Sequence, residues 1–105
     1  MYIYDNKYDK KIEITKGDTG SFTVNIKGYE GMSEDKIMFS VRDSIGGEYR
    51  MEKTVPLGSA ITMDTTDTNL PAKKYLYDLV LKTADGQRIT LIKPSTFEVI
   101  EGVAD

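Results

Sequence analysis

The sequence of 105 residues contains no cysteine, no histidine and no tryptophan. Without cysteine, neither a disulfide framework nor a thiolate metal site can form. Without histidine, catalytic Ser-His-Asp and Cys-His arrangements are excluded, as are the usual zinc and iron sites. An enzyme built from this chain would therefore have to use carboxylate, lysine or tyrosine chemistry.

The chain also lacks an apolar run long enough to cross a membrane and an excess of positive charge. Its N-terminus is rich in tyrosine and charge, unlike a signal peptide, so we expect synthesis in the cytoplasm without export by a classical signal. Lys+Arg number 14 against Asp+Glu 17, a net charge of -3. This balance provides no attractive field for nucleic acid or anionic lipid. We therefore expect no nucleic-acid partner, no membrane partner and no cofactor.

What the sequence does have is alternation of polar and apolar residues with a period of two. In Ser21–Lys27, the residues Phe22, Val24 and Ile26 fall on one side and polar residues on the other, which is typical of a half-buried strand. No segment shows a sustained helical stripe. Similar alternation predicts strands at 11–15, 36–42, 48–55, 59–64, 75–81, 88–93 and 96–101.

Turn signals separate these segments, among them Gly46-Gly47 and Ala84–Gln87. Seven or eight short strands with such spacing indicate a sandwich or a small barrel. Leu70-Pro71 followed by Tyr75-Leu76-Tyr77 is similar to the tyrosine-corner region of immunoglobulin-like domains, with Tyr75 at the corner and Tyr77 where an antibody domain has its second cysteine. We therefore predict an all-β fold, an immunoglobulin-like antiparallel β-sandwich over residues 11–105, preceded by an N-terminal arm over residues 1–10.

One catalytic motif deserves a test. Asp18-Thr19-Gly20 matches the signature of aspartic proteases, whose retroviral members are homodimers with one copy per chain. That chemistry needs two aspartates sharing a proton across a two-fold axis. In that family the aspartate follows an apolar strand, whereas here it follows the polar Lys16-Gly17. We interpret the motif as a turn between two strands, in which Asp18 caps backbone amides, and we predict that the protein is not an enzyme.

Other polar clusters also fail as chemical sites. Asp64 and Asp67 with their threonines lack the ligand spacing of a calcium loop, and we interpret them as a hydrogen-bonded turn. Asp5 and Asp9 fail the same test, so we predict no metal site. The lysine pairs at 10–11 and 73–74 border strands and indicate solvated positions.

The N-terminal arm is the first candidate for binding. It carries three of the seven tyrosines, and tyrosine is enriched at interfaces because its ring buries area while its hydroxyl keeps a partner. We consider two interpretations: an arm that contacts a partner, or an extra strand packed on its own domain. The strand at 48–53 alternates charges and is interpreted as a protected edge. The candidate partner contacts are Tyr2, Ile3, Tyr4 and Tyr8.

Three segments carry a resemblance to a known group, namely Ile12–Phe22, Leu70–Asp78 and Lys93–Val99. Over residues 11–100 the chain resembles small immunoglobulin-like proteins of phages and prophages of Gram-positive bacteria, and is similar to the N-terminal domain family of the phage baseplate upper protein. One departure is a lysine, at Lys73 or Lys74, where the group usually has a glycine before the corner tyrosine. Baseplate upper proteins also continue beyond this domain, so we expect a freestanding accessory unit.

The resemblance implies a non-enzymatic structural protein of the virion, displayed as a capsid decoration or as a tail or baseplate accessory. Its partners would be phage capsid or tail proteins, and possible self-association would make a homo-oligomer. The main alternative is a soluble carbohydrate- or host-surface-binding module. Tyr29 and Tyr49 are the candidate aromatic residues for such a site. A homodimeric aspartic protease acting through Asp18 is the third reading.

Overall fold

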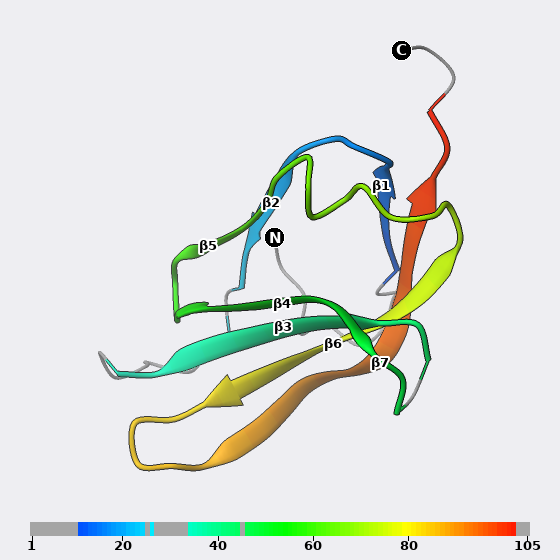
Figure 1. Cartoon of the computed structure of the whole chain (residues 1–105). Coiled ribbons are helices and arrows are strands. Elements are labelled where there is room, and N and C mark those ends of the chain that lie inside the picture. The colour runs from blue at the N-terminus through cyan, green and yellow to red at the C-terminus, as the bar shows by residue number, and fades with distance from the viewer. Residues whose placement is uncertain (1–10, 25, 27–33, 45, 103–105) are drawn as a thin grey trace.

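The computed structural model describes residues 11–24, 26, 34–44 and 46–102, which form seven β-strands and no helix (Figure 1). Within these residues no helix is long and apolar enough to cross a membrane. The strands are β1 (Ile12–Thr15), β2 (Gly20–Thr23), β3 (Lys36–Arg42), β4 (Tyr49–Pro56), β5 (Ala60–Met63), β6 (Lys74–Lys82) and β7 (Arg88–Ile100).

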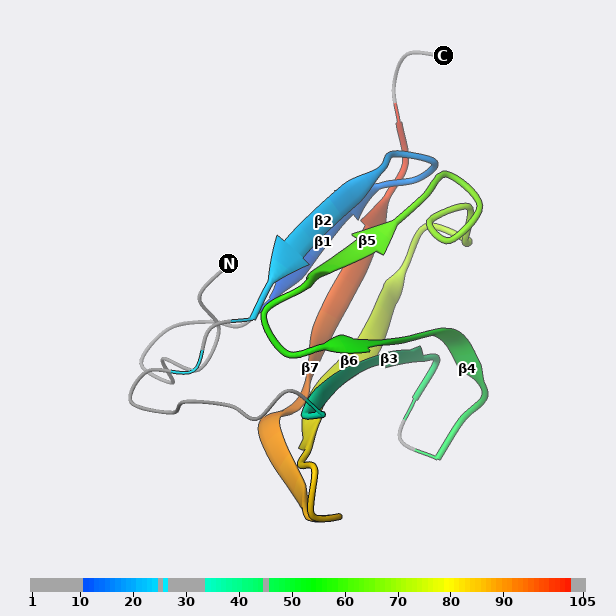
Figure 2. The same cartoon turned by 90° about the vertical axis from the view of Figure 1, so that its left-hand side faces the viewer.

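The strands form two layers. One sheet has the order β1-β7-β6-β3-β4, and the smaller sheet pairs β2 with β5 above it (Figure 2). Immunoglobulin domains likewise place their C, F and G strands in one sheet and B and E in the other, which correspond here to β3, β6, β7 and to β2, β5. The predicted all-β, immunoglobulin-like sandwich is confirmed.

The first strand departs from a purely antiparallel arrangement. β1 pairs with β7 in parallel, with Ile12 opposite Phe97 and Thr15 opposite Ile100. The turn after Thr15 carries the chain to β2 in the other layer, so β1 has no hairpin partner and pairs with the last strand instead. All other pairings are antiparallel.

The break expected between the strands at 88–93 and 96–101 is wrong. β7 is one strand of 13 residues, Arg88–Ile100, and the two predicted strands at 88–93 and 96–101 fall within it except for Glu101. Its register against β6 shifts between Tyr77 and Leu79, so that one β6 residue, Asp78, faces two residues of β7. Proline has no N–H to donate, and a bulge on a strand with one open side accommodates it without a lost ladder bond.

The core lies between the two sheets and is built by the alternation seen in the sequence. Its centre is Phe39, which is fully buried and lies 5.2 Å from the ring of Phe22, 5.7 Å from Tyr77 and 6.1 Å from Phe97. In antibody domains the B and F strands carry a disulfide and the C strand a tryptophan. Here aromatic rings from β2, β3 and β6 fill that space, which explains how the fold forms without cysteine or tryptophan.

The tyrosine corner is present. Tyr75, at the start of β6 and 1% exposed, donates its hydroxyl hydrogen to the backbone carbonyl of Pro71 at 2.6 Å. The bond spans the connection that enters β6, as in immunoglobulin-like domains. The lysines that replace the usual glycine do not prevent it.

Candidate binding surface

The predicted arm contacts Tyr2, Ile3, Tyr4 and Tyr8 lie outside the described residues, as does Tyr29. The candidate surface described below consists of residues of the described strands.

Asp18 lies in the turn that joins β1 to β2, as predicted. The predicted capping of backbone amides by its side chain is wrong, because within the described residues only the backbone of Asp18 forms hydrogen bonds. Its backbone N–H donates to the carbonyl of Thr15 at 2.9 Å, and its own carbonyl accepts the hydroxyl hydrogen of Thr68 at 2.7 Å. Gly17 has a φ of 83°, a conformation that favours glycine. The Asp18 side chain is exposed, in contrast to the buried loop that holds a protease aspartate.

Asp64 and Asp67 form the predicted hydrogen-bonded turn. The Asp64 N–H donates to Asp67 Oδ2 at 2.9 Å, and the Asp67 N–H donates to Asp64 Oδ1 at 2.8 Å. Lys53 Nζ lies 2.8 Å from Asp67 Oδ2. Burial opposes ionisation of Asp67, but Lys53 and the Asp64 N–H outweigh it and lower the pKa of the carboxyl. In the described residues no three acidic, histidine or cysteine side chains gather as a metal site.

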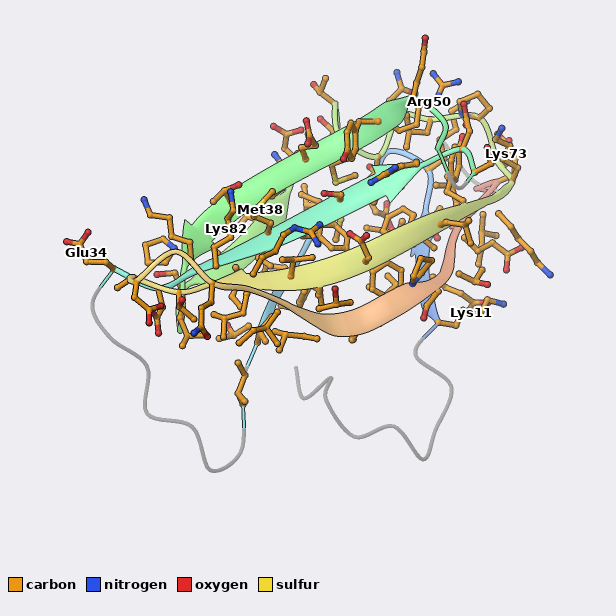
Figure 3. The ribbon with its side chains drawn as sticks, turned by 90° about the horizontal axis from the view of Figure 1, so that it is seen from below. Lys11, Glu34, Met38, Arg50, Lys73 and Lys82 are labelled. Atoms are coloured by element: carbon orange, nitrogen blue, oxygen red, sulfur yellow. The ribbon has the colours of Figure 1, made fainter. Side chains whose placement is uncertain are left out.

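The candidate surface is the outer side of the five-stranded sheet, which points away from β2 and β5 (Figure 3). It carries basic, acidic, hydroxyl and apolar side chains together. Directly opposed residues of neighbouring strands share a face, so the pairing registers define it. We call this surface the outer face. Its central residues are Lys36, Met38, Ser40 and Arg42 of β3, Lys74, Leu76, Asp78, Val80 and Lys82 of β6, and Arg88 and Thr90 of β7. Ser40 and Val80 are buried, 6% and 3% exposed, and the other residues are at least partly exposed.

One end of the outer face presents an arginine and a tyrosine together. The guanidinium carbon of Arg42 lies 4.4 Å above the ring centroid of Tyr49, and Arg42 Nη2 donates to the Tyr49 hydroxyl at 2.9 Å. Tyr49 stays 49% exposed, the largest value among the exposed large apolar side chains of the described residues. Such cation–π pairs hold a ring in place while leaving one face free.

A shallow depression of about 120 Å³ adjoins this pair. Its lining residues combine hydroxyl, carboxylate, guanidinium and apolar groups, and come from β3, the turn after it, β6 and β7: Ser40, Arg42, Ser44, Leu76, Tyr77, Asp78 and Pro94. A depression of this size can receive one side chain of a partner. It is too small for a drug-sized ligand, whose pockets hold at least about 300 Å³.

A charge cluster fixes the loop beside this end. Asp43 Oδ2 accepts from Arg50 Nε at 3.1 Å and Nη2 at 2.8 Å, and Asp43 Oδ1 lies 3.0 Å from Lys73 Nζ. Arg50 above all, and Lys73 next, lower the pKa of the Asp43 carboxyl. Through Lys73 the cluster links the β3–β4 turn to the tyrosine corner, and Figure 3 shows Arg50 and Lys73 at the same end of the sheet.

The opposite end of the face carries the predicted β6–β7 hairpin. Gly86 has a φ of 92°, and the Thr83 N–H donates to the Gln87 carbonyl at 2.9 Å. Asp35, 1% exposed, anchors the hairpin, because its Oδ1 accepts the Ala84 N–H at 2.8 Å. The predicted strand begins at residue 36, directly after Asp35, and the sequence pattern did not predict the burial of Asp35.

Both edges of this sheet region resist strand addition. β4 is the predicted edge strand, and its Arg50 and Glu52 are exposed. On the other side β1 covers β7 only from Phe97 to Ile100, and the uncovered stretch holds Pro94 and two register shifts. Charges, proline and bulges all disfavour pairing with another chain. The two edges are therefore less suited to binding another chain than the outer face is.

No protein-family model, no curated protein and no solved structure matches this chain. The resemblance of residues 11–100 to phage immunoglobulin-like proteins therefore remains a prediction. The sequence pattern indicated Tyr49 as an exposed aromatic residue, but the outer face as a whole was not predicted, since it depends on which strands become neighbours.

Proposed function

We propose that this protein is a non-enzymatic structural or accessory protein of a phage virion, displayed as a capsid decoration or as a tail or baseplate accessory. It binds its virion partner through the outer face, with the N-terminal arm as a second contact. The observation that carries the binding role is the ordered Arg42–Tyr49 pair beside a side-chain-sized depression, on a sheet whose edges are protected. Arginine and tyrosine are, together with tryptophan, enriched in interface hot spots. The phage context rests on the sequence resemblance.

The first test locates the protein in purified particles by mass spectrometry and imaging. A Tyr49→Ser variant should reduce its copy number on particles at limiting protein, with affinity weakened about tenfold or more. The matched control is Ile89→Ser, which removes an exposed apolar side chain, 42% exposed, from another part of the sheet. Absence of the protein from particles, or equal binding by the two variants, would contradict the proposal.

The arm is tested by deleting residues 1–10. We expect the truncated protein to retain the circular dichroism and cooperative unfolding of the sandwich, because the described core is formed by residues 22–99. It should bind particles more weakly. Undiminished binding of the truncated protein would remove the arm from the proposal.

A carbohydrate-binding module is the second candidate, favoured by the exposure of Tyr49. Sugar sites stack rings on aromatic faces, and Arg42 already occupies one face of the Tyr49 ring. A glycan array probed with the wild-type protein and the Tyr49→Ser variant separates the two functions. Binding to a glycan that is lost in the variant would favour the carbohydrate-binding function over the virion role.

A further inference from the structure

Three positive charges lie side by side across the hairpin end of the outer face. Lys36 of β3 is directly opposite Lys82 of β6, and Lys82 is directly opposite Arg88 of β7. All three side chains are exposed. We call Lys36, Lys82 and Arg88 the basic row.

The basic row is unfavourable for the isolated protein. Like charges directly opposite one another on neighbouring strands destabilise a sheet, and Lys82 has such a neighbour on both sides. In the part of the chain that the structure describes, none of the three makes an ion pair or a side-chain hydrogen bond. Other basic residues of that part do have partners: Lys11 contacts Glu13 and Glu98, Arg42 contacts Tyr49, Arg50 and Lys73 contact Asp43, and Lys53 contacts Asp67.

The surroundings of the row are open to a ligand. A depression of about 330 Å³ adjoins the row on the hairpin side. Lys36 and Lys82 line it together with Thr83 and Gln87, whereas Arg88 lies outside its lining. Glu34 also lines it, but Figure 3 shows the Glu34 side chain pointing away from Lys82, beyond the end of β3. The hairpin wall is held in place by Asp35 through Ala84.

We propose that the basic row binds a short run of carboxylates on the partner protein, an inference that rests on the proposed function and specifies its partner's chemistry. The row crosses three strands and so spans about 10 Å, two interstrand spacings, which suits two or three acidic side chains. A protein partner is favoured over nucleic acid because the chain has a net charge of -3, which repels a long polyanion while leaving local pairing possible. Bound carboxylates relieve the repulsion within the row.

In the test, the full chain is titrated with a hexaglutamate peptide at low ionic strength, and two-dimensional NMR monitors the backbone amide signals. We expect amide shifts at Lys36, Lys82 and Arg88 and along the hairpin, and a loss of affinity as salt is added. Shifts that are absent there, or spread evenly over the surface, would overturn the proposal. A twelve-residue oligothymidylate that binds the row more tightly than hexaglutamate would overturn the assignment to a protein partner.

The deciding variant is Lys82→Gln, matched with Lys74→Gln on the same strand and the same face. Lys74 is opposite Glu98, so its removal loses a favourable pairing, whereas removal of Lys82 relieves two unfavourable ones. We expect Lys82→Gln to weaken hexaglutamate binding about fivefold and to raise the unfolding midpoint by about 1–4 °C. Lys74→Gln should keep the affinity and lower the midpoint.

Equal losses of peptide affinity in the two variants would show a general charge effect and overturn the inference. A lowered midpoint for Lys82→Gln would show that Lys82 is already favourably paired, and would overturn it as well. The peptide assay needs no particles. Failure at the row is thus distinguished from failure of the virion role, which is judged by the presence of the protein in particles.

Discussion

At the scale of single residues, the Tyr75 hydroxyl stabilises the tyrosine corner through a hydrogen bond that the ring alone cannot make. Burial raises the pKa of Tyr75, so the hydroxyl stays protonated and can donate to Pro71. The Lys73 ammonium lies 5.0 Å from the centroid of the same ring. Ring and hydroxyl together hold the connection that enters β6.

Replacement of Tyr75 by phenylalanine should lower the free energy of unfolding by about 1 kcal/mol, since the part-buried hydrogen bond to the Pro71 carbonyl is lost while the ring remains. Urea denaturation at pH 7 measures the change. Tyr49→Phe is the matched control, because it removes a hydroxyl from an exposed ring and should stay within about 0.5 kcal/mol. If both variants lost the same free energy of unfolding, the hydrogen bond between Tyr75 and Pro71 would not contribute more than an exposed one.

The surface carboxylates determine the response to acid. Arg50 lowers the pKa of Asp43 from its ordinary value of 3.8, and Lys11 lowers the pKa of Glu98 from its ordinary value of 4.5. A carboxyl with a lower pKa in the folded state binds fewer protons than in the unfolded chain, so stability is present above the unfolded pKa and is lost as pH falls through the folded value.

We therefore expect the urea midpoint to be level between about pH 5 and 8 and to decrease below about pH 4.5. An Asp43→Asn variant should be less stable than the wild type at pH 7 and should lose less stability on acidification. Glu52→Gln, which removes an exposed carboxylate of β4, is the charge-matched control. If Asp43→Asn and the wild type show the same acid dependence, the Asp43–Arg50 pair does not contribute.

At the scale of elements, the β6–β7 hairpin depends on one backbone conformation. Gly86 has a φ of 92°, and a Cβ at this position would meet no atom within 4 Å, so the requirement is conformational and not steric crowding by neighbours. The hydroxyl of Thr83 binds the Asp85 carboxylate and accepts the Gln87 N–H, which closes the turn. This turn positions Lys82 and Arg88 opposite each other.

Gly86→Ala should lower the free energy of unfolding by about 1–2 kcal/mol, because alanine is strained in the left-handed region. Gly86→Asn should lose less, since asparagine tolerates that region better. Gly102→Ala, where φ is not in that region, is the control and should be nearly neutral. Thermal unfolding of the three variants measures their relative stability. A Gly86→Ala variant as stable as the wild type would contradict the prediction.

At the scale of the whole molecule, the sandwich is closed by contacts between distant parts of the chain. β1 begins at Ile12 and pairs with β7 from Phe97, so the first and last described strands meet. The core around Phe39 combines rings from both sheets, such as Phe22 of β2 and Phe97 of β7. Such non-local pairing must overcome loop-closure entropy before it is stabilised.

We therefore expect folding on the scale of milliseconds to seconds and not microseconds, as for other sandwiches of this size. Stopped-flow refolding from urea, followed by tyrosine fluorescence, measures the rate. A dominant microsecond phase that accounts for the full signal change would contradict this expectation.

Much of the fold was predictable because burial imposes a period of two on each strand. The alternation in residues 36–42 and 75–81 matched β3 and all but the end residues of β6, and the Asp85-Gly86 signal located the hairpin. β2 ends at Thr23, although the alternation continues to Ile26. The break expected between 88–93 and 96–101 was wrong, because the pattern within one segment does not show that a bulge on a partly uncovered strand accommodates Pro94.

The candidate surface was less predictable. Sequence alone determined the chemistry that is excluded, the strand periods, the turns and the likeness of Leu70–Tyr77 to a tyrosine corner, because each follows from residue type or short-range spacing. Only the tertiary structure decided that β1 joins β7 in parallel, and that Lys36, Lys82 and Arg88 stand in one row. Register across strands is set by packing between segments far apart in the chain, and the pattern within one segment does not contain it.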